Sequence, residues 1–304
     1  MIHHSLLHII GNTPVVRLPA FSAETGFDVY AKLESLNPGG SHKSRIALAM
    51  VRDAEERGVL VPGSGQTIIE PSGGNTGIGL AIAANILGYR LVLVIPDNYS
   101  PEKQQLLRLY GAEVVLSDSR RGNNSHGERA MELQLEHPEY VMLNQQRNPA
   151  NPAIHRRTTA QEVLRDFQDF PPDCLVAGIG TGGHITGLGE VLKAHWPTLG
   201  VFGVEPEECD LLHNCHARHG IQGLSIGLVP AVLNLAVLDG MLKVSRHDCL
   251  ARARKTLRED GLSLGLSSAA NLAAIALMTD EWMKGTRVLT LVYDSVDSYL
   301  PEFA

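Results

Sequence analysis

The sequence predicts an α/β protein made of two units, each a three-layer arrangement in which helices cover both faces of a mostly parallel, twisted sheet. Three observations indicate this class. Apolar runs alternate with amphipathic stretches along the chain, as they do in strand–helix–strand units. Several of the apolar runs are nearly continuous, which is typical of strands buried on both faces. The alternation restarts near residue 145, which divides the chain into two series of elements.

The strands expected before residue 145 are residues 27–33, 66–70, 90–95 and 113–116. A helix that begins at Lys43 has apolar side chains at helical spacing, namely Ala47, Met50, Val51 and Ala54. A second helix is expected over residues 76–87, and Gly88 ends it. A third opens at Ser100, a cap residue that is followed by proline at the first helical position.

The second series has the same alternation. Its expected strands are residues 174–178, 201–205, 241–244 and 288–292. Its expected helices are residues 155–167, 184–195, 247–259 and 268–278. Helices between successive strands allow the strands to run parallel, so a second sheet of the same kind is predicted.

Composition and charge exclude several classes of protein. The chain has 304 residues and a net charge of −7, which argues against nucleic acid as a partner. No apolar run approaches the length of a membrane span, and the N-terminus lacks the pattern of an export signal. The four cysteines have no framework spacing, which is typical of reduced thiols. We therefore expect a cytoplasmic protein.

Histidine and cysteine cluster at His213, Cys215, His216 and His219. These residue types can bind zinc, but the spacing fits no standard zinc motif. A solvated histidine-rich loop is therefore the preferred interpretation, and no metal is expected.

Lys43 is the residue that best predicts chemistry. The apolar spacing after it places Lys43 on the buried face of a helix, at the N-terminal end. A positive helix end and burial both disfavour an ammonium group, and imine chemistry needs the neutral amine. The alternative is an ordinary first-turn lysine whose amine reaches solvent.

A glycine-rich turn joins the strand that ends at Glu70 to the next helix. Its residues are Ser72, Gly73, Gly74, Asn75 and Thr76. Backbone N–H groups at a helix start favour an anion, and the hydroxyls and the amide add donors, so a carboxylate is the natural ligand. The alternative is an ordinary helix cap and turn.

A second glycine-rich turn leads from the strand at residues 174–178 into a helix. It contains Gly178, Gly180, Thr181, Gly182, Gly183 and His184. Such a turn suits a phosphate group. It also matches the dinucleotide fingerprint, with Glu205 placed as the ribose-binding acid, which would indicate a nicotinamide cofactor.

Ser267 opens a later helix, where its hydroxyl serves either as a cap or as the partner of a heteroaromatic nitrogen.

Taken together, these segments resemble the fold-type II family of pyridoxal phosphate enzymes, nearest to the branch of cysteine synthase (O-acetylserine sulfhydrylase) and cystathionine β-synthase. The resemblance runs from Ile10-Gly11-Asn12-Thr13-Pro14 to Ser298-Tyr299-Leu300 and includes Asn144-Gln145-Gln146-Arg147 and Gly220-Ile221-Gln222-Gly223. It implies a tryptophan synthase β-like fold. Residues 1–40 and 146–304 would form the larger domain that binds the cofactor phosphate. Residues 41–145 would form a smaller, mobile domain that carries the carboxylate loop.

The resemblance implies a role for each matching residue. Lys43 would hold pyridoxal 5'-phosphate as an imine and move the Cα proton. Asn75 would lie beside the ring oxygen of the cofactor, and Ser267 would meet the ring nitrogen. The phosphate would be bound by Gly180, Thr181, Gly182, Gly183 and His184. The substrate would be bound by Ser72, Gly73, Gly74, Asn75, Thr76, Gln145 and Gly223.

Several positions depart from the family pattern, among them His42 and Ser44 beside the lysine and Val296 near the C-terminus. Gly73 stands where a hydroxyl residue is usual, His184 stands where threonine is usual, and Ser225 belongs to a pair that replaces two small residues. These positions border the expected substrate or cofactor. The reaction class is therefore better predicted than the donor.

The resemblance implies β-replacement on a serine derivative through an aminoacrylate intermediate, with cysteine synthesis from O-acetylserine and sulfide as the first choice. One alternative is net β-elimination, as in a cysteine desulfhydrase or a serine/threonine dehydratase. Another is replacement with a different nucleophile, as for cystathionine, cyanoalanine or diaminopropionate. From other classes, a nicotinamide-dependent oxidoreductase and a cofactor-binding regulator stay open. The resemblance also implies a homodimer and a serine acetyltransferase partner, with no role for nucleic acid or membrane.

Overall fold

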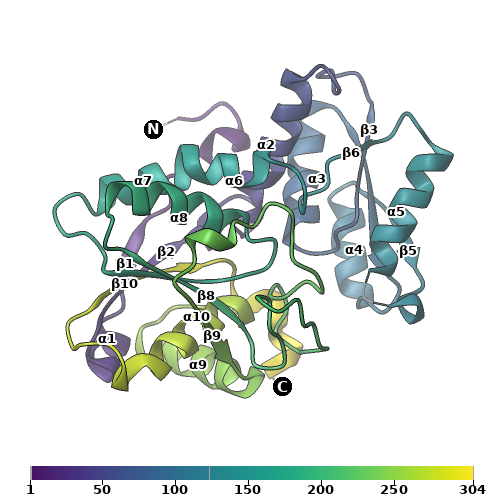
Figure 1. The fold of residues 1–304 in the computed structure, drawn as a ribbon. Helices are drawn as coiled ribbons and strands as arrows, with labels where there is room; N and C mark the ends of the chain where they lie inside the picture. Colours follow the sequence, from purple (N-terminus) through teal and green to yellow (C-terminus); the bar gives the residue numbers. More distant parts are fainter. Residues whose placement is uncertain (1, 123, 304) are drawn as a thin grey trace. The chain divides into compact units, whose positions relative to one another are not determined.

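The computed structural model describes residues 2–122 and 124–303, which fall into two compact units. Unit 1 contains Asn37–Asn151 and the N-terminal segment up to Ile10. Unit 2 contains Gly11–Leu36 and the chain from Pro152 onward. Each unit has its own sheet, with helices on both faces, as Figure 1 shows. The predicted α/β class with mostly parallel sheets is confirmed.

Unit 1 has a four-stranded parallel sheet in the order β5-β4-β3-β6. Its strands are β3 (Thr67–Glu70), β4 (Arg90–Pro96), β5 (Glu113–Ser117) and β6 (Val141–Met142). Its helices are α2 (Lys43–Glu56), α3 (Asn75–Leu87), α4 (Pro101–Leu109) and α5 (Ser125–Glu136). Val92 and Val94 of β4 pack towards α5, whereas Leu93 on the opposite face approaches Gly77 of α3. The alternation along β4 thus separates α5 from α3.

Unit 2 has a six-stranded sheet in the order β1-β2-β10-β7-β8-β9, in which only the β1–β2 pair is antiparallel among the described strands. Its strands are β1 (Val15–Arg17), β2 (Asp28–Leu33), β7 (Cys174–Gly178), β8 (Gly200–Pro206), β9 (Gly240–Val244) and β10 (Arg287–Val292). Its α-helices are α1 (Pro19–Thr25), α7 (Ala160–Asp166), α8 (Gly183–His195), α9 (Arg246–Glu259) and α10 (Leu266–Leu277), with α6 (Ala150–Ile154) at the boundary of the units in the chain. Helices α7 and α8 cover one face of the sheet, and α1, α9 and α10 cover the other (Figure 1).

The two units also contain short 3-10 segments, namely Leu6–Ile9, Glu34–Leu36, Ser119–Arg121, Leu235–Val237, Met278–Asp280 and Val296–Phe303.

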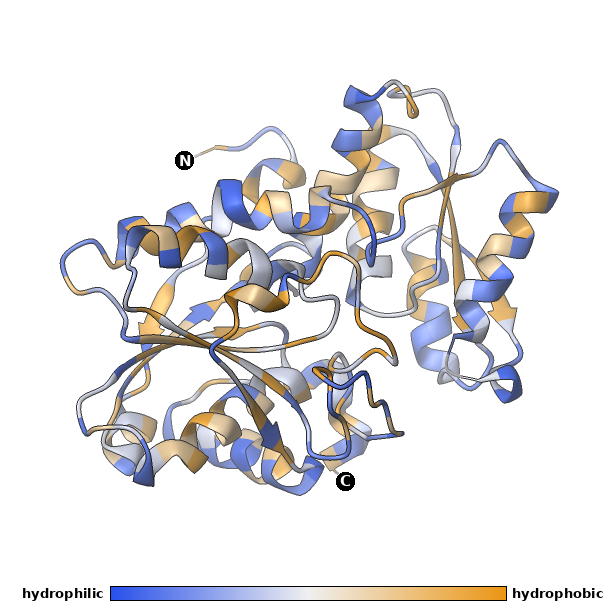
Figure 2. Cartoon of the chain, in the orientation of Figure 1, coloured by the Kyte–Doolittle hydropathy of each residue, from blue (hydrophilic) through white to orange (hydrophobic). Residues whose placement is uncertain are grey.

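Burial explains why the strands can be predicted from the sequence. Figure 2 shows apolar residues concentrated on the central strands of each sheet. All residues of β3 and of β7 are buried, as expected for parallel strands between two helical layers. Helix α2 buries the four apolar residues that its spacing predicts, and Gly88 ends α3 in the left-handed conformation.

One expected helix differs from its prediction. The segment predicted as a helix over residues 155–167 begins earlier, with α6, and contains a π-helical turn at His155–Thr159. A Cβ atom on Gly187 of α8 would lie 2.6 Å from the Pro152 carbonyl oxygen and 2.7 Å from the His155 Cβ. The two helices therefore pack in backbone contact at this turn, a tertiary effect that no local pattern predicts.

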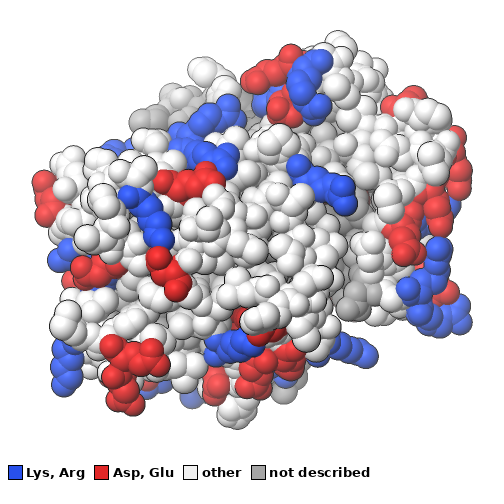
Figure 3. Space-filling model, in the orientation of Figure 1, with Lys and Arg blue, Asp and Glu red and all other residues white. Residues whose placement is uncertain are grey.

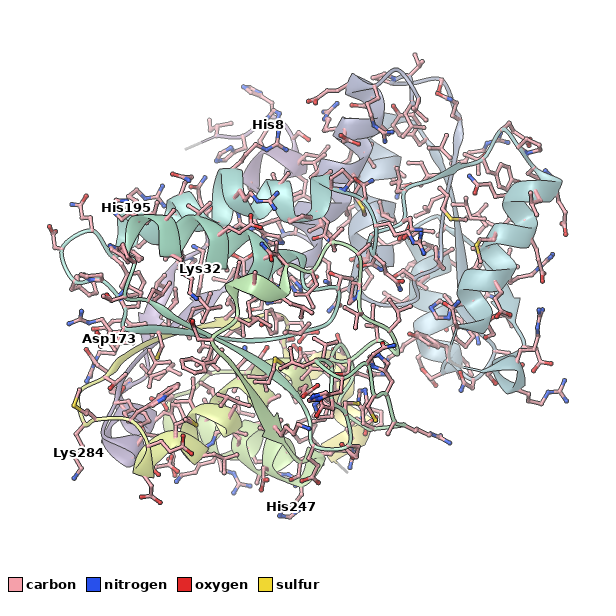
Figure 4. The ribbon with its side chains drawn as sticks, viewed as in Figure 1. His8, Lys32, Asp173, His195, His247 and Lys284 are labelled. Atoms are coloured by element: carbon pink, nitrogen blue, oxygen red, sulfur yellow. The ribbon has the colours of Figure 1, made fainter. Side chains whose placement is uncertain are left out.

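A buried ion pair anchors α7 to the sheet of unit 2. Lys32 of β2, labelled in Figure 4, is fully buried, and its Nζ lies 2.9 Å from Glu162 Oε2. The same ammonium donates to the Thr13 carbonyl oxygen at 2.9 Å. Breaking such a pair leaves an uncompensated buried charge, so it fixes the helix on the sheet.

In the sheet of unit 2, the amino ends of two strands are joined by a hydrogen bond, whereas a glycine turn lies at the carboxyl ends. Asp173, labelled in Figure 4, precedes β7 and accepts the N–H of Arg287 at 2.7 Å, which joins the amino ends of two strands. Gly180 follows the carboxyl end of β7, and the Gly223 carbonyl lies against it. The carboxyl ends of parallel strands are where ligands bind in open α/β sheets, so the second glycine turn has the expected position.

Charges of both signs are mixed on the face seen in Figure 3. Among the described residues, no helix is long and apolar enough to cross a membrane.

Candidate active site

Lys43 is the first residue of α2 and is half-buried. Two consecutive glycines with positive φ, Gly39 at +80° and Gly40 at +74°, form the turn that precedes the helix. The Lys43 N–H donates to Ser41 Oγ at 3.3 Å, which helps to fix the first turn. A Cβ atom on Gly79 of α3 would lie 3.1 Å from the Ser44 Cα, so α2 and α3 pack in backbone contact there. Lys43 is thereby held close to the start of α3.

The turn before α3 leaves the helix N-terminus without a side-chain cap. Its N-cap residue, Gly74, is extended, exposed and has no capping hydrogen bond. Thr76 Oγ1 donates to Gln145 Oε1 at 2.8 Å, so the two residues predicted to bind substrate are joined. Because the amide oxygen of Gln145 accepts from Thr76, its amide nitrogen is the group left to act as a donor. Uncapped backbone N–H groups beside such a donor suit a carboxylate.

Glu70, at the end of β3, holds Gln145 in place. The β3–β6 ladder ends at the pair Ile69–Met142, and the Glu70 carboxylate continues it by accepting the N–H of Asn144 at 2.7 Å and of Gln145 at 2.9 Å. Glu70 is fully buried, and burial raises the pKa of its carboxyl to about 7, although the two N–H groups oppose the rise. Burial therefore disfavours the ionised form of Glu70, and the two N–H groups partly offset that cost.

Tyr99 explains why position 73 is glycine. A Cβ atom on Gly73 would lie 2.6 Å from Tyr99 Cε1 and 2.7 Å from Ile95 Cγ2. Both distances are too short for real Cβ contacts, so the tyrosine ring occupies the space that a side chain at position 73 would need. The hydroxyl expected at this position in the family pattern is thus replaced by an aromatic wall.

The second turn, between β7 and α8, has no side-chain cap at the helix start. Its N-cap residue, Gly182, has φ +77°, and Thr181 and His184 are buried beside it. A Cβ atom on Gly180 would lie 2.4 Å from the Gly223 carbonyl oxygen, and one on Gly182 would lie 2.6 Å from Leu233 Cδ1. Only glycine allows the backbone to approach so closely.

His184 is paired with a tyrosine from β10's end. Its Nε2 lies 3.0 Å from the Tyr293 hydroxyl, which also lies 3.4 Å from the Gly178 carbonyl oxygen. The hydroxyl has one proton, so when it donates to Gly178 the imidazole must donate to it. The His155 ring stacks edge-on against His184 with centroids 6.1 Å apart. The imidazole orientation is therefore fixed by buried neighbours.

Ser267 is the second residue of α10 and is 6% exposed. A Cβ atom on Gly223 would lie 3.7 Å from Ser267 Oγ, so these two predicted site residues are neighbours. The next residue, Ser268, accepts the Tyr293 N–H at 2.9 Å, which ties the start of α10 to the end of β10. Unit 2 thus brings together Gly180, Thr181, Gly182, Gly183, His184, Gly223 and Ser267 around the start of α8 and α10.

The Glu205 carboxylate does not have the role that a nicotinamide site requires, which is to accept hydrogen bonds from a ribose. It is 1% exposed, and its Oε2 accepts the Leu211 N–H at 2.8 Å. The acid therefore stabilises its own loop, and burial raises the pKa of its carboxyl.

In the histidine-rich loop, His213 pairs with Asp210 and His216 with Asn214. Within the described residues, no group of three or more His, Cys, Asp or Glu side chains could hold a metal ion.

Sequence reasoning missed three partners of the site: Glu70, Tyr99 and Tyr293. Glu70 contacts residues 74 and 75 positions later in the chain, and His184 meets Tyr293 across 109 positions. No local pattern signals such contacts. The departures at Gly73 and His184 were the available clues, because a changed residue implies a changed neighbour.

The residues present fit a phosphorylated pyridine cofactor. The turn at Gly180–Gly183 offers uncapped helix N–H groups and glycine backbone that a side chain would block, as a phosphate requires. Ser267 offers a hydroxyl next to that turn for a ring nitrogen. Lys43 offers the amine that an aldehyde needs.

These features define an enzyme class that handles an amine substrate and a phosphorylated aldehyde, and comparison with known proteins agrees. The family described as pyridoxal-phosphate dependent enzyme matches residues 6–294. The chain belongs to this family, and the predicted resemblance and cofactor are confirmed.

Named relatives refine the class. A cysteine synthase from Staphylococcus aureus is 40% identical over 297 residues, which cover 97% of this chain and 95% of the relative. A cysteine synthase from a Flavobacterium species is 45% identical over 261 residues, which cover 85% and 83%.

Solved structures agree with this fold. An O-ureido-L-serine synthase superposes with a TM-score of 0.94 at 38% identity, over 99% of this chain and 94% of that one. A hydrogen sulfide-producing enzyme from Fusobacterium nucleatum superposes with a TM-score of 0.91 at 36% identity, over 98% of both chains.

Proposed function

We propose that this enzyme is a cysteine synthase, which replaces the β substituent of a serine derivative with sulfide. The observation that carries the proposal is a pair of uncapped, glycine-led helix starts, one in each unit. The first has donors suited to a carboxylate, and the second has the close-packed glycines suited to a phosphate. The enzyme of such a reaction must bind two anionic groups, the carboxylate of the amino acid and the phosphate of the cofactor. Relatives of 40% and 45% identity carry the same name.

In unit 1, the chain binds the amino acid and moves its proton. The Lys43 amine holds the cofactor covalently at rest and, once displaced, takes the Cα proton. The carboxylate lies on the N–H groups of Gly74, Asn75 and Thr76, with Ser72 and the Gln145 amide as further donors, and the Gly73 backbone completes the turn. Asn75 would also contact the ring oxygen of the bound cofactor.

In unit 2, the chain holds the cofactor. Gly180, Thr181, Gly182, Gly183 and His184 bind the phosphate, and Ser267 meets the ring nitrogen. Gly223 lies against Ser267 and leaves room for substrate. When bound, pyridoxal phosphate supplies an aldehyde that condenses with amines and a ring that withdraws electrons from Cα.

The net reaction balances within these roles. The Cα proton goes to Lys43, the β substituent leaves with its bonding electron pair, sulfide bonds to Cβ and Lys43 returns a proton to Cα. Movement of residues 72–76 over the carboxylate would exclude water while the β position is reactive. The proposal that residues 41–145 form the smaller, mobile domain and that residues 1–40 and 146–304 bind the phosphate extends this movement to a whole domain.

The test is a substrate matrix on the purified, cofactor-loaded enzyme. O-Acetylserine, O-phosphoserine, serine and cysteine are added singly, and the absorbance of the bound cofactor and the release of pyruvate are followed. Sulfide is then added and cysteine is quantified. We expect O-acetylserine or a related ester to change the absorbance, and sulfide to give cysteine at a rate that exceeds pyruvate release.

A matched pair of variants accompanies this matrix. Lys43→Ala should lose turnover by at least about a thousandfold, because proton transfer and covalent attachment are both removed. Lys284→Ala, which removes an exposed lysine just before β10 in unit 2, should keep it. Full turnover in Lys43→Ala, or no response of the wild type to any donor, would refute the proposal.

A second candidate is net β-elimination with release of sulfide from cysteine. The superposition on a hydrogen sulfide-producing enzyme favours it, and Gly73 departs from the family pattern within the proposed carboxylate turn. Cysteine that yields pyruvate and sulfide faster than O-acetylserine yields cysteine would select this candidate. Other nucleophiles, such as cyanide, homocysteine or an amine, belong in the same matrix, since another relative by fold is an O-ureido-L-serine synthase.

We also propose that the enzyme is a cytoplasmic homodimer and that a serine acetyltransferase is a partner. The free state of Cys174, Cys209, Cys215 and Cys249 supports a reducing compartment. Light scattering of the pure enzyme and co-purification with an acetyltransferase would test the assembly.

A further inference from the structure

Ser225 combines two unfavourable features in the loop after Gly223. Its φ is +41°, a left-handed conformation that is uncommon for any residue with a side chain. The side chain is only 7% exposed, and its Oγ is buried without a hydrogen-bond partner in the part of the chain that the structure describes. A glycine would remove the strain, and an alanine would remove the unpaired hydroxyl. Retention of both features in one residue needs a reason.

The backbone of Ser225 is held on both sides. Its N–H donates to the Ile179 carbonyl oxygen at 2.8 Å. Its carbonyl oxygen lies 3.2 Å from His219 Nε2, and His219 Nδ1 accepts the Ile221 N–H at 3.2 Å. Since Nδ1 accepts, Nε2 has the proton and donates to Ser225. Both polar backbone groups are therefore satisfied, and the hydroxyl is the one polar group of Ser225 that is not.

The location of Ser225 is in the proposed site. Ile179, its backbone partner, directly precedes Gly180 of the phosphate turn. The Gly223 carbonyl lies against Gly180, and Gly223 also faces Ser267. The loop from Gly223 to Ser225 thus borders the residues that are proposed to hold the cofactor phosphate and ring nitrogen.

The other polar parts of the reactants already have partners. The substrate carboxylate is assigned to the turn before α3, the cofactor phosphate to the turn before α8 and the ring nitrogen to Ser267. The polar part that is left is the β substituent of the donor. We propose that Ser225 is a specificity-determining residue whose hydroxyl donates a hydrogen bond to an oxygen of that substituent, such as an ester oxygen on the serine side chain. This inference rests on the proposed function.

The test compares two donors across two variants of the cofactor-loaded enzyme. O-Acetylserine has oxygens in its β substituent, whereas β-chloroalanine loses chloride and has none. Ser225→Ala removes the hydroxyl and keeps the strained backbone, and Ser225→Gly removes both. We expect each variant to lower kcat/KM for O-acetylserine about tenfold, with less than about a twofold change for β-chloroalanine. Ser225→Gly should also raise the melting temperature, because glycine adopts a positive φ without strain.

Asn214→Gly is the matched control. Asn214 also has a positive φ, +54°, but it is exposed in the histidine-rich loop of the same unit. Its replacement should raise the melting temperature and leave the preference between donors unchanged. This control separates relief of strain from loss of the hydroxyl.

The outcomes are distinct. An unchanged donor preference in Ser225→Ala and Ser225→Gly, while the wild type uses both donors, would overturn the inference and leave the proposed function standing. Loss of stability in Ser225→Ala without a change in preference would also overturn it, since the hydroxyl would then serve a buried water. A wild type that uses neither donor would overturn the proposed function as well. If Ser225→Ala fails to fold, Ser225→Gly gives the same comparison.

Discussion

The turns before α3 and α8 have the same local design but are held by different forces. Both are rich in glycine, and in both helices the N-cap residue is a glycine without a side-chain cap. The turn before α3 packs against Tyr99 at Gly73 but is open at Gly74, and polar contacts through the Glu70 carboxylate and the Thr76–Gln145 pair hold Gln145 beside it. The turn before α8 is held by close packing, with Gly180 against Gly223 and Gly182 against Leu233.

This difference matches the proposed ligands. Hydrogen-bonded groups can exchange partners when a substrate enters and leaves in each turnover. Close-packed backbone has no such freedom, because a well-packed interior does not deform continuously. A cofactor that stays through many turnovers suits the packed turn. The comparison teaches that the same glycine pattern serves exchange or retention according to what surrounds it.

The largest expected effect contrasts two glycines. In Gly180→Ala the new Cβ would lie 2.4 Å from a carbonyl oxygen, whereas a Cβ on Gly74 meets nothing within 4 Å. Gly180→Ala should weaken cofactor binding by about 100-fold or more, since relief needs a backbone shift that costs about 3 kcal/mol. Gly74→Ala should keep cofactor affinity. Fluorescence titration of the apoenzyme with pyridoxal phosphate measures both, and equal affinities would contradict the distinction between a packed and an open turn.

The second effect concerns pH and the hydrogen-bonded turn. The native pKa of Glu70 is about 7 against an ordinary 4.5, so between these values the unfolded chain loses its proton first. The stability contributed by the protonated group is complete below pH 4.5 and is lost as pH rises through 7, by up to about 3 kcal/mol. Glu70→Gln cannot titrate. The difference in unfolding free energy, wild type minus Glu70→Gln, should therefore fall over this range in denaturant titrations.

The matched control for this titration is Glu113→Gln, which removes an exposed acid at the start of β5. A difference between wild type and Glu70→Gln that stays flat over this pH range would show that Glu70 has an ordinary pKa. Glu70→Gln should also weaken substrate binding above pH 7, because an amide accepts one of the two N–H groups and opposes the other with its own donors.

A third, smaller effect tests the aromatic wall. Gly73→Ser should destabilise the protein by about 1–3 kcal/mol, because the new side chain overlaps the Tyr99 ring. The same change in a Tyr99→Ala background should cost less, since the ring is gone. The four proteins form a double-mutant cycle, read by thermal or denaturant unfolding. Additive costs would mean that Tyr99 does not fill this space.

The smallest effect tests whether the Tyr293 hydroxyl, by holding His184, contributes to the cofactor affinity of the packed turn. Tyr293→Phe leaves His184 Nε2 without the hydroxyl that lies 3.0 Å away. Cofactor affinity should fall about tenfold, because one buried partner is lost, while kcat of the saturated enzyme should change little. Tyr30→Phe, which removes a hydroxyl bonded to Asp28 on β2, is the control and should keep full affinity. A drop in kcat without a change in affinity would contradict the role of Tyr293 in holding His184.

Much of the fold followed from the sequence, for a physical reason. Buried parallel strands need continuous apolar runs, and the strand predicted at residues 66–70 is found as Thr67–Glu70. The cap at Ser100 is also present, with its side chain accepting the Lys103 N–H. Other elements were not predicted, among them β1 with three residues, β6 with two, and α5, a helix of unit 1.

The candidate site divides in the same way. The glycine turns and Lys43 could be found because backbone conformation and helix starts leave a local signature. Their supports could not, because Glu70, Tyr99 and Tyr293 act through contacts that form only in the folded chain. The prediction of roles for individual residues is still to be tested.

The most direct test is to locate the covalent attachment of the cofactor. The loaded enzyme is reduced with borohydride and digested, and the peptide that has gained a pyridoxyl group is sequenced by mass spectrometry. Our account predicts the modification on Lys43, at the start of α2. A pyridoxyl group on any other lysine, or none on an enzyme that binds the cofactor fully, would contradict it.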